Sequence, residues 1–374
     1  MAQPTDTTRR GKGRGVSAMV SVPRQLELFA HFFGEDDYSN TVDLWDSIPK
    51  HCLNPRQQAA LRDANGRLEV FEHRFDFRGK DCRVEVTPAR VMGEDGRRWD
   101  FYPSHDEKLI ETVLRKIFVD GQHGGHDVHE LESWVTFTLG MVRRELKARQ
   151  RTRTIDEIKR SIDIMNQTTV RVFLGNDPNP VYSGSILPDV VRVTRDEWLQ
   201  DASTRWAVRL PTLVSKSIND HTYRQLNYRI WFELNSSFGQ WLFERMSHRF
   251  TQAGGLNKFS MSFSAMQRDS GMLRQQRPSA NVKTVEKALE ELKERDVLLF
   301  WTKDEERGKR NAIVDIKYHL TASDQFRRDQ VESNKRAKAI RIDRGEEQLP
   351  RVGRSRRHGE EPVRLIPQQA DGGR

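Results

Sequence analysis

The strongest constraint on the fold is a pattern of apolar residues that occurs twice, about 127 positions apart. Each copy has apolar side chains at helical spacing, followed directly by a β-branched segment of strand type. The first copy contains Ile155, Ile158, Ile162 and Met165 with strand residues 169–174, and the second contains Val282, Val285, Leu289 and Leu292 with strand residues 297–302. Upstream, Ile110, Val113, Leu114 and Phe118 correspond to Phe238, Trp241, Leu242 and Met246, and Phe137 corresponds to Phe263. The repetition predicts two copies of one module.

Each copy is expected to hold three helices closed by a β-hairpin. The helices are predicted at about 106–118, 138–147 and 155–167 in the first copy, and at about 236–250, 264–270 and 282–295 in the second. The second hairpin is predicted from strands Val297–Thr302 and Ala312–Leu320, joined by a charged tip at 303–311. Three helices and a hairpin describe a winged helix, a variant of the helix-turn-helix. The predicted fold class is therefore α+β, with two tandem winged-helix domains. Basic residues near the third helix and the tip favour DNA binding over a repeat that serves packing alone.

The formal net charge of +9 is concentrated at the two ends of the chain. Residues 1–24 carry five Lys/Arg and one acid, and residues 331–374 carry eleven Lys/Arg and seven acids, so the residues between them are nearly neutral. Charged ends that are poor in aromatic residues are typical of disorder. We expect four parts: a disordered basic tail at 1–39, a first winged-helix domain with an N-terminal β extension at 40–205, a second winged-helix domain at 206–325, and a disordered basic tail at 326–374.

Composition excludes several classes of protein. No apolar run approaches the roughly 18 residues of a membrane-spanning helix, so a membrane protein is excluded. The polar, basic start lacks the apolar core of a secretory signal. Cys52 and Cys82 form neither a disulfide framework nor a metal-type pair. We therefore expect an intracellular protein.

The two third helices differ in charge near their first turns. Thr154 and Glu157 have the spacing of a capping box, and the acidic first turn of that helix would face phosphates unfavourably. The second helix, with a predicted cap at Ser279 or Asn281, has its basic residues early and its acids late, and Arg and Gln precede it. Arg and Gln make bidentate contacts with guanine and adenine, so we predict that the second module reads sequence and that the first grips phosphates or mediates dimerisation. The predicted DNA-binding residues are Arg149, Arg151, Arg153 and Lys159 in the first module, and Arg274, Gln275, Gln276, Arg277, Lys283, Thr284, Lys287, Arg307, Lys309 and Arg310 in the second.

Several segments between about residues 40 and 335 together resemble one known family. They are Leu44–Lys50, Thr87–Val91, Asp100–Pro103 with Glu107–Arg115, Thr222–Tyr228, Met246–Ala253 and Gln267–Gly271. On these segments the chain resembles the replication initiator protein A family of bacterial plasmids, and more distantly the TrfA-type initiators. The resemblance implies a cytoplasmic bacterial protein with two winged-helix domains that bind repeated sequences, iterons, in double-stranded DNA at a plasmid origin. It also implies that the protein helps to melt the origin and recruits host machinery, including the replicative helicase and the host initiator. Both a monomer and a homodimer stay open as the active form.

A short motif lies between the basic start and the first domain. Gln25, Leu26, Leu28 and Phe29 are similar to the bacterial sliding-clamp-binding peptide, which TrfA-type initiators also carry. In an extended segment, Leu28 and Phe29 can enter an apolar pocket while Gln25 forms hydrogen bonds at its rim. The alternative is that these apolar residues pack on the first domain. The motif predicts the host sliding clamp as a partner.

Catalytic motifs do not support an enzyme. His123, His126 and His129 lack the His-hydrophobic-His spacing of rolling-circle nickases, and a glycine-containing loop between helices explains them more simply than a metal cluster. No Gly-Lys pair stands in a nucleotide-binding loop, and no nucleophile elbow occurs. We predict no catalytic residues, no metal and no cofactor. A transcriptional regulator, a plasmid partition protein and a nonspecific DNA-bridging protein are the alternatives to an initiator.

Overall fold

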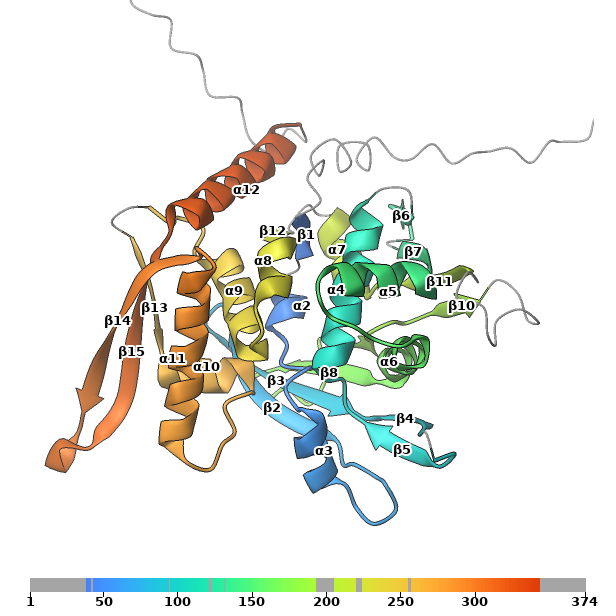
Figure 1. The fold of residues 1–374 in the computed structure, drawn as a ribbon, viewed down its shortest axis with the longest axis horizontal. Coiled ribbons are helices and arrows are strands. Elements are labelled where there is room, and N and C mark those ends of the chain that lie inside the picture. The colour runs from blue at the N-terminus through green and yellow to red at the C-terminus, as the bar shows by residue number, and fades with distance from the viewer. Residues whose placement is uncertain are drawn as a thin grey trace, which may run out of the picture.

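The computed structural model describes residues 38–41, 43–93, 95–120, 123–130, 132–192, 205–219, 224–254 and 257–343. Within them, each predicted module contains its three helices at the expected places (Figure 1). The first module has α4 (His105–Val119), α5 (Leu139–Ala148) and α6 (Ile155–Gln167), and the second has α9 (Ser237–Arg249), α10 (Phe263–Ser270) and α11 (Pro278–Glu294). The agreement follows from the apolar spacing together with strong caps. Thr154 and Glu157 form the predicted capping box of α6, and Ser104 and Glu107 form another at α4.

The second module is a complete winged helix. Strand β13 (Lys258–Ser262) lies between α9 and α10, and the hairpin β14 (Leu298–Arg307) and β15 (Ile313–Ala322) follows α11. The three strands form an antiparallel sheet in the order β13-β15-β14, so the first strand pairs with the returning arm of the wing. Because β14 continues to Arg307, the wing tip is the short segment 308–312 and not the predicted 303–311.

The first module distributes the same elements over two sheets. Its hairpin, β8 (Thr169–Leu174) and β9 (Tyr182–Ser185), joins an N-terminal pair, β2 (Phe71–Phe77) and β3 (Lys80–Thr87), in the order β2-β3-β8-β9. This pair is part of the predicted N-terminal β extension. Strand β7 (Glu132–Thr138) belongs to a second sheet in the order β10-β11-β7-β6, with β6 (Gly124–Asp127), β10 (Val190–Arg192) and β11 (Arg205–Arg209).

The position of β11 corrects the predicted domain boundary at 205/206. That boundary cuts through the strand, which pairs antiparallel with β7 over its whole length. Trp206 and Val208 point into the first module, and the Trp206 ring lies 6.4 Å from that of Phe137. The first module therefore extends to Arg209, because burial of Trp206 requires it to stay with β7.

The remaining elements connect and cover the modules. They are β1 (Tyr38–Thr41), which pairs with β12 (Arg224–Asn227), the helices α2 (Asp43–Ser47), α3 (Pro55–Leu61), α7 (Thr212–Asn219) and α8 (Tyr228–Glu233), the hairpin β4 (Ala89–Met92) with β5 (Arg98–Phe101), and the one-turn helix η1 (Lys309–Asn311) in the wing tip. One hydrophobic cluster runs through both modules, from Trp45 to Phe326. The two winged helices are therefore parts of one packed body.

Helix α12 (Asp324–Asp343) corrects the prediction of a disordered tail from residue 326. Phe326 is buried, with its ring 6.3 Å from that of Phe243 and 6.2 Å from that of Phe250. The Ser323 hydroxyl accepts the backbone N–H of Phe326 and so caps the first turn. A single aromatic anchor is too weak a sequence signal to reveal this docking. Residues 1–37 and 344–374, which hold the rest of both predicted tails and the clamp-like motif at Gln25–Phe29, lie outside the described residues.

No helix in the described part of the chain is long and apolar enough to cross a membrane.

Candidate nucleic-acid interface

Helix α11, the third helix of the second module, buries one face and exposes another. Its apolar residues, among them Val285 and Leu289, are buried, and the helix packs on α9. Lys283 and Lys287 lie one turn apart on the exposed side, in the half of the helix that starts at Pro278. Among the described residues, neither lysine has a carboxylate partner. Their charges are therefore available to a ligand at the end of the helix that a helix-turn-helix protein presents to base edges.

The start of α11 differs from the prediction. The helix begins at Pro278, and its N-cap residue Arg277 makes no side-chain capping bond, so neither predicted cap is correct. Proline suits the first helical position because its fixed φ matches the helix and its missing N–H would be unsatisfied there. Asn281 has another role: it accepts the backbone N–H of Gln275 at 3.0 Å and donates to the Gln275 carbonyl at 2.9 Å. This pair of bonds fixes the turn that precedes α11.

Three of the four acids of α11 have hydrogen-bond partners inside the protein. Glu286 accepts from Lys303 of β14 at 2.7 Å, and Glu290 accepts the indole N–H of Trp301 at 2.9 Å. The hydrogen bond that Lys303 donates to Glu286, more than the charge of Glu286, raises the pKa of Lys303. Glu291 accepts the backbone N–H of Asn235, just ahead of α9. The contacts of Glu286 and Glu290 attach the wing to the helix, and the Lys303 ammonium offsets the charge of Glu286.

The four polar residues ahead of α11 have different environments. Arg274 turns back toward β2: its Nε donates to the Gly271 carbonyl at 2.7 Å, its guanidinium lies 4.8 Å from the Phe71 ring centroid, and its Nη2 is 3.2 Å from His73 Nδ1. The Gln275 side chain donates to the hydroxyl of Thr284 at 3.0 Å. The other two, Gln276 and Arg277, are exposed. Among the described residues, the side chains of these two have no hydrogen-bond or ion-pair partner, and they extend the surface of Lys283 and Lys287.

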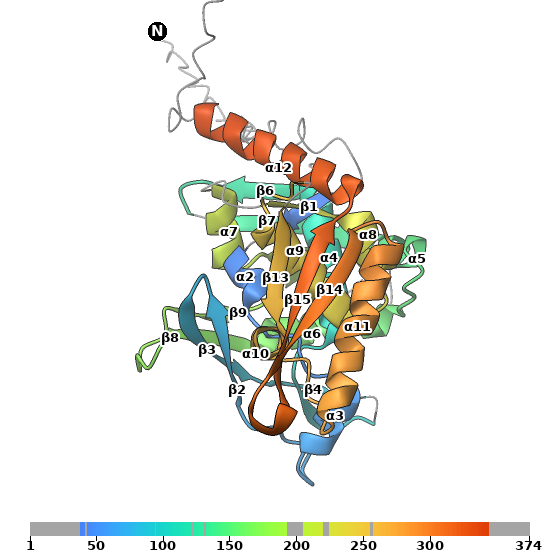
Figure 2. The ribbon, with the colours of Figure 1, turned by 90° about the vertical axis from the view of Figure 1, so that its left-hand side faces the viewer.

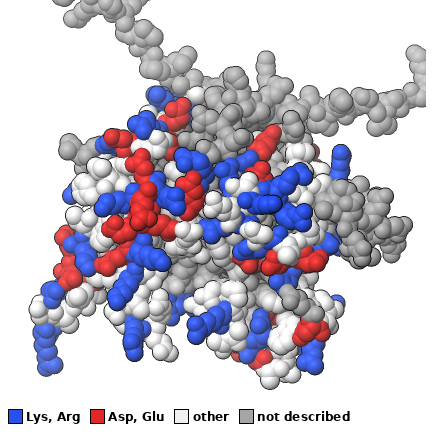
Figure 3. All heavy atoms as spheres, viewed as in Figure 1, with Lys and Arg blue, Asp and Glu red and all other residues white. Residues whose placement is uncertain are grey.

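Three exposed basic residues lie at or next to the wing tip: Arg307 ends β14, and Lys309 and Arg310 are in the tip itself. Arg310 and Asn311 have φ of 59° and 61°, so the tip turns through the left-handed region, and Arg307 donates to the Asn311 carbonyl at 3.2 Å. Figures 1 and 2 show the tip projecting from the body at the same end of the molecule as the start of α11. In the space-filling view, blue Lys and Arg atoms occupy this lower left edge (Figure 3). The helix start and the wing tip thus form one basic edge.

The first-module arginines predicted to bind DNA make contacts between or within modules. Arg151 donates to the carbonyls of Leu234 at 2.8 Å and Phe232 at 3.3 Å, and the Arg149 guanidinium lies 5.1 Å from the Tyr228 ring centroid. Arg153 pairs with Asp106, and Lys159 lies 3.6 Å from Asp156. The structure does not bring these four residues together with the basic edge of the second module. Two of them instead join the end of α5 to α8.

Helix α6 presents a different surface from α11. Asp156 stands where α11 has Lys283, one repeat later, and its side chain is 93 % exposed. Ile164 is buried because β4 lies over it, with Ala89, Val91 and the partly buried Phe101 around it. Helix α6 thus has an acidic first turn and a covered flank, and the expectation that the first module does not read bases stays a prediction.

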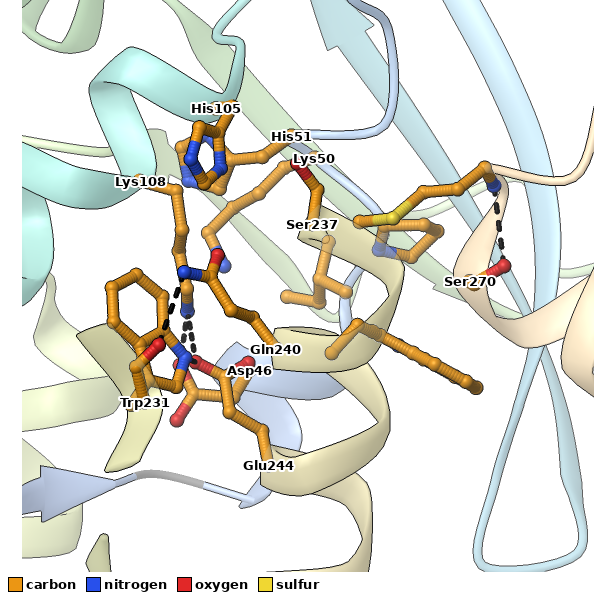
Figure 4. A pocket seen from close by; sticks show the side chains of 14 residues that line it. Asp46, Lys50, His51, His105, Lys108, Trp231, Ser237, Gln240, Glu244 and Ser270 are labelled. Carbon is orange, nitrogen blue, oxygen red and sulfur yellow. Dashed lines mark hydrogen bonds and ion pairs between the residues drawn. The ribbon is translucent and has the colours of Figure 1, made fainter. Parts of the chain in front are cut away.

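A buried network of charged side chains joins the modules, and sequence reasoning missed it. Figure 4 shows Asp46 of α2, Lys108 of α4 and Glu244 of α9 converging from three elements. Lys108 Nζ lies 3.4 Å from Asp46 and 2.9 Å from Glu244, and Arg115 lies 2.8 Å from Asp46 and 2.6 Å from Glu111. Charged residues are usually exposed, so no pattern in the sequence indicated this buried network. Its residues do fall within or next to segments that carry the family resemblance.

The charges in this network compensate one another. Burial favours a higher pKa for Asp46, but the charges of Arg115 and Lys108 outweigh it and hold that pKa well below its usual range. Burial lowers the pKa of Lys50 to about 8 and that of His51 to about 4. His51 is therefore neutral at pH 7, and its Nε2 donates to the Glu111 carboxylate at 3.0 Å. Because its charges face one another, the network positions α4 against α9 and is not part of the basic edge.

The three histidines near residue 126 lie around a hairpin and not in a loop between helices. His126 is on β6, buried, with Nδ1 2.9 Å from the Ser133 hydroxyl of β7. Among the described residues, no group of three His, Cys, Asp or Glu side chains could hold a metal ion.

Comparison with solved structures gives distant likenesses. No protein-family model and no curated protein matches the chain. Two solved structures of domains 2 and 3 of RctB, one a selenomethionine derivative, are similar over 75 % and 74 % of this chain and 98 % of theirs, with 11 % and 12 % identity and TM-scores of 0.43 and 0.38. The Pi initiator protein in complex with iteron DNA is similar over 64 % of this chain and 98 % of that chain, with 9 % identity and a TM-score of 0.38. The winged-helix description rests on the connectivity and sheet order of this chain.

Proposed function

We propose that the protein is a plasmid replication initiator that binds iterons in double-stranded origin DNA through its second winged helix. The observation that carries the proposal is the basic edge: Lys283 and Lys287 of α11 have no carboxylate partner among the described residues, and the start of α11 lies at the same end of the molecule as the wing tip (Figure 2). The start of α11 enters the major groove, where Gln276 and Arg277 are placed to reach base edges. The wing tip contacts the adjacent backbone. The segments that resemble plasmid initiators support an origin as the target.

The resemblance supports the finer parts of the proposal. Binding strains the adjacent duplex and promotes melting, and the replicative helicase and the host initiator are recruited to the melted site. The motif at Gln25, Leu26, Leu28 and Phe29 engages the host sliding clamp, which a Leu28→Ala/Phe29→Ala variant tests by loss of clamp binding. The first module contributes contacts to the backbone or to a second copy of the chain.

Binding of the purified protein to its own plasmid's origin tests the proposal. Footprinting is expected to show protection of repeated sites, and an origin that shows no protected repeat would refute the function. Lys283→Ala/Lys287→Ala is expected to weaken origin binding and to lower the slope of log K against log salt by about 2, since each phosphate contact contributes roughly 0.9.

The matched control is Lys293→Ala. This lysine lies on the same helix, is 50 % exposed and is near the other end, 3.8 Å from Glu290. Its replacement should leave the affinity and the salt slope close to those of the unaltered protein. Equal losses in the control and the double variant would place the DNA elsewhere. Arg277→Ala is expected to lower the preference for iterons over random duplex without an equal loss on random duplex.

A further inference from the structure

The helix-turn-helix of the second module, α10 and α11 with the turn between them, lies against the N-terminal extension of the first module. Strand β2 is at the edge of its sheet, and α10 packs along it (Figures 1 and 2). An edge strand carries backbone N–H groups that have no partner within the sheet. One of them, the N–H of Asp76, donates to the buried carboxylate of Asp269 on α10 at 2.9 Å. At this point the sheet edge is therefore closed by the helix-turn-helix.

His73, earlier on the same strand, joins α10 to the turn that follows it. Its Nε2 lies 2.6 Å from the carbonyl oxygen of Arg268, and its Nδ1 lies 3.2 Å from Arg274 Nη2. Because a carbonyl can only accept, Nε2 carries the proton, and Nδ1 accepts the guanidinium N–H. Burial lowers the pKa of His73, which agrees with this neutral form. One side chain of the first module thus bonds both the last turn of α10 and the turn ahead of α11.

Two further contacts hold the turn at the same place. The Arg274 guanidinium lies 4.8 Å from the centroid of the Phe71 ring, and that ring stacks on His73 with 6.0 Å between centroids. Gly271, with φ of 64°, approaches the first module so closely that an added Cβ would lie 3.3 Å from Cys52 Cβ and from the His73 ring. The start of the turn is therefore packed on the first module at both Gly271 and Arg274.

The part of the turn that follows Arg274 has few contacts of its own. The Asn281 side chain bonds the backbone of Gln275, and Arg277 makes no capping bond at the start of α11. Gln276 and Arg277 are exposed. The direction in which these two side chains point is therefore set by where Arg274 is held. A segment that is ordered before it binds also loses less conformational entropy on binding.

We propose that His73 is a positioning residue for DNA recognition: through Arg274 it fixes the turn ahead of α11, so that Gln276 and Arg277 meet base edges. The inference rests on the proposed function, because it takes α11 as the helix that reads the origin. The first module then contributes to sequence selection without touching a base. Arg274 holds the turn and does not bind DNA. Because contacts to phosphates do not depend on the turn, loss of His73 weakens binding to the origin and not to random duplex.

The test is a double-mutant cycle in the full chain, with His73→Ala, Arg277→Ala and the two changes combined. Fluorescence anisotropy over a salt series gives the affinity of each variant for origin and random duplexes. The matched control is His319→Ala on β15. Like His73, His319 is half-buried on a strand and has a partner at each ring nitrogen: Nδ1 lies 2.7 Å from Ser260 Oγ, and Nε2 lies 3.0 Å from Asp304.

His73→Ala is expected to lower the ratio of origin to random binding by roughly threefold to tenfold, the range of coupling between residues in contact. The salt slope should not change, since no phosphate contact is lost. The combined variant should have the ratio of Arg277→Ala alone to within about twofold, because His73 acts through the position of Arg277. His319→Ala should leave the ratio unchanged. Equal ratios for the two histidine variants, or losses that multiply in the combined variant, would overturn the proposal.

Arg274→Ala separates the two roles that this arginine can have. As part of the brace it should lower the ratio of origin to random binding and leave the salt slope unchanged. A slope that falls by about 0.9 would assign Arg274 to a phosphate and overturn the proposal.

Two further outcomes separate the sources of error. If the unaltered protein shows no preference for origin DNA, the proposed function fails, whereas a preference that His73→Ala retains in full refutes the role of His73 alone. If His73→Ala does not fold, as judged by circular dichroism, Phe71→Leu takes its place. That change keeps an apolar side chain and removes the aromatic face next to Arg274, so the ratio should fall in the same direction, and an unchanged ratio would overturn the proposal.

Discussion

Replacing Arg115 with methionine would leave two buried carboxylates without their shared cation. The Arg115 side chain is 5 % exposed, against 2 % for Asp46 and 1 % for Glu111, and its two nitrogens lie 2.8 Å and 2.6 Å from these acids. Breaking a buried pair costs about 3 to 5 kcal/mol. Asp46 keeps Lys108 at 3.4 Å, and Glu111 keeps the Trp45 indole N–H at 2.6 Å, so we expect the lower end, about 3 kcal/mol. That is a large part of the roughly 5 to 15 kcal/mol by which proteins are stable.

Urea unfolding followed by tryptophan fluorescence measures this loss, because Trp45 and Trp231 are buried at the network. The matched control is Arg74→Met, whose pair with Asp81 has a similar length of 2.6 Å but side chains that are 55 % and 53 % exposed. The control should cost less than about 1 kcal/mol, because an exposed pair is screened by solvent. Equal costs for the two variants would refute the argument that burial decides the strength of this network.

The pH dependence of Arg115→Met gives a second check. In the unaltered protein, burial favours a higher pKa for Asp46 and Glu111, and Arg115 with the neighbouring cations holds both pKa values well below the usual range. Without Arg115 both pKa values rise, so the folded variant takes up protons that the folded parent does not. The stability difference between the two proteins should therefore shrink as the pH falls from 7 to 5. A difference that grows over this range would contradict the assignment.

Three further results are expected. Burial lowers the pKa of His51 to about 4, below the value of about 6.5 in an unfolded chain, so the unfolded state binds more protons between these two pH values. The free energy of unfolding therefore decreases as the pH falls, by about 2 kcal/mol from pH 7 to 5. His51→Gln should lose most of this pH dependence in urea titrations. Gly271→Ala, at φ 64° with Cys52 Cβ 3.3 Å from the added carbon, should lower the melting temperature more than Gly96→Ala, at φ 73° with nothing within 4 Å; equal shifts would exclude the contact. Burial raises the pKa of Cys52 to about 12, so a thiol reagent should label it only after unfolding, and fast labelling of the native protein would contradict its burial.

Much of the helical framework was predictable because local signals agree. The apolar stripe of α6, its capping box at Thr154 and Glu157, and the strand that follows it all lie within about twenty residues. The charge asymmetry between α6 and α11 was equally visible, since Asp156 and Lys283 occupy equivalent places in the repeat. Local patterns of this kind do not require knowledge of distant contacts.

The errors occur where distant residues decide. Trp206 was assigned to the wrong module because its partner Phe137 is far away in sequence, and Phe326 was assigned to a tail because it docks on Phe243 and Phe250 of another helix. Arg274, predicted to contact DNA, is turned toward His73 of the N-terminal extension. None of these pairings leaves a periodic trace in the chain.

The sequence by itself determined two winged-helix modules and the charge of the surface that each third helix presents, because helical spacing, caps and turn residues act over a few positions. Only the tertiary structure decided which charged residues are exposed. Arg115 is buried between two acids, Arg151 is held by backbone carbonyls, and Lys283 remains open. All three side chains carry one positive charge, and their availability to DNA depends on the partners that folding brings within a few ångströms.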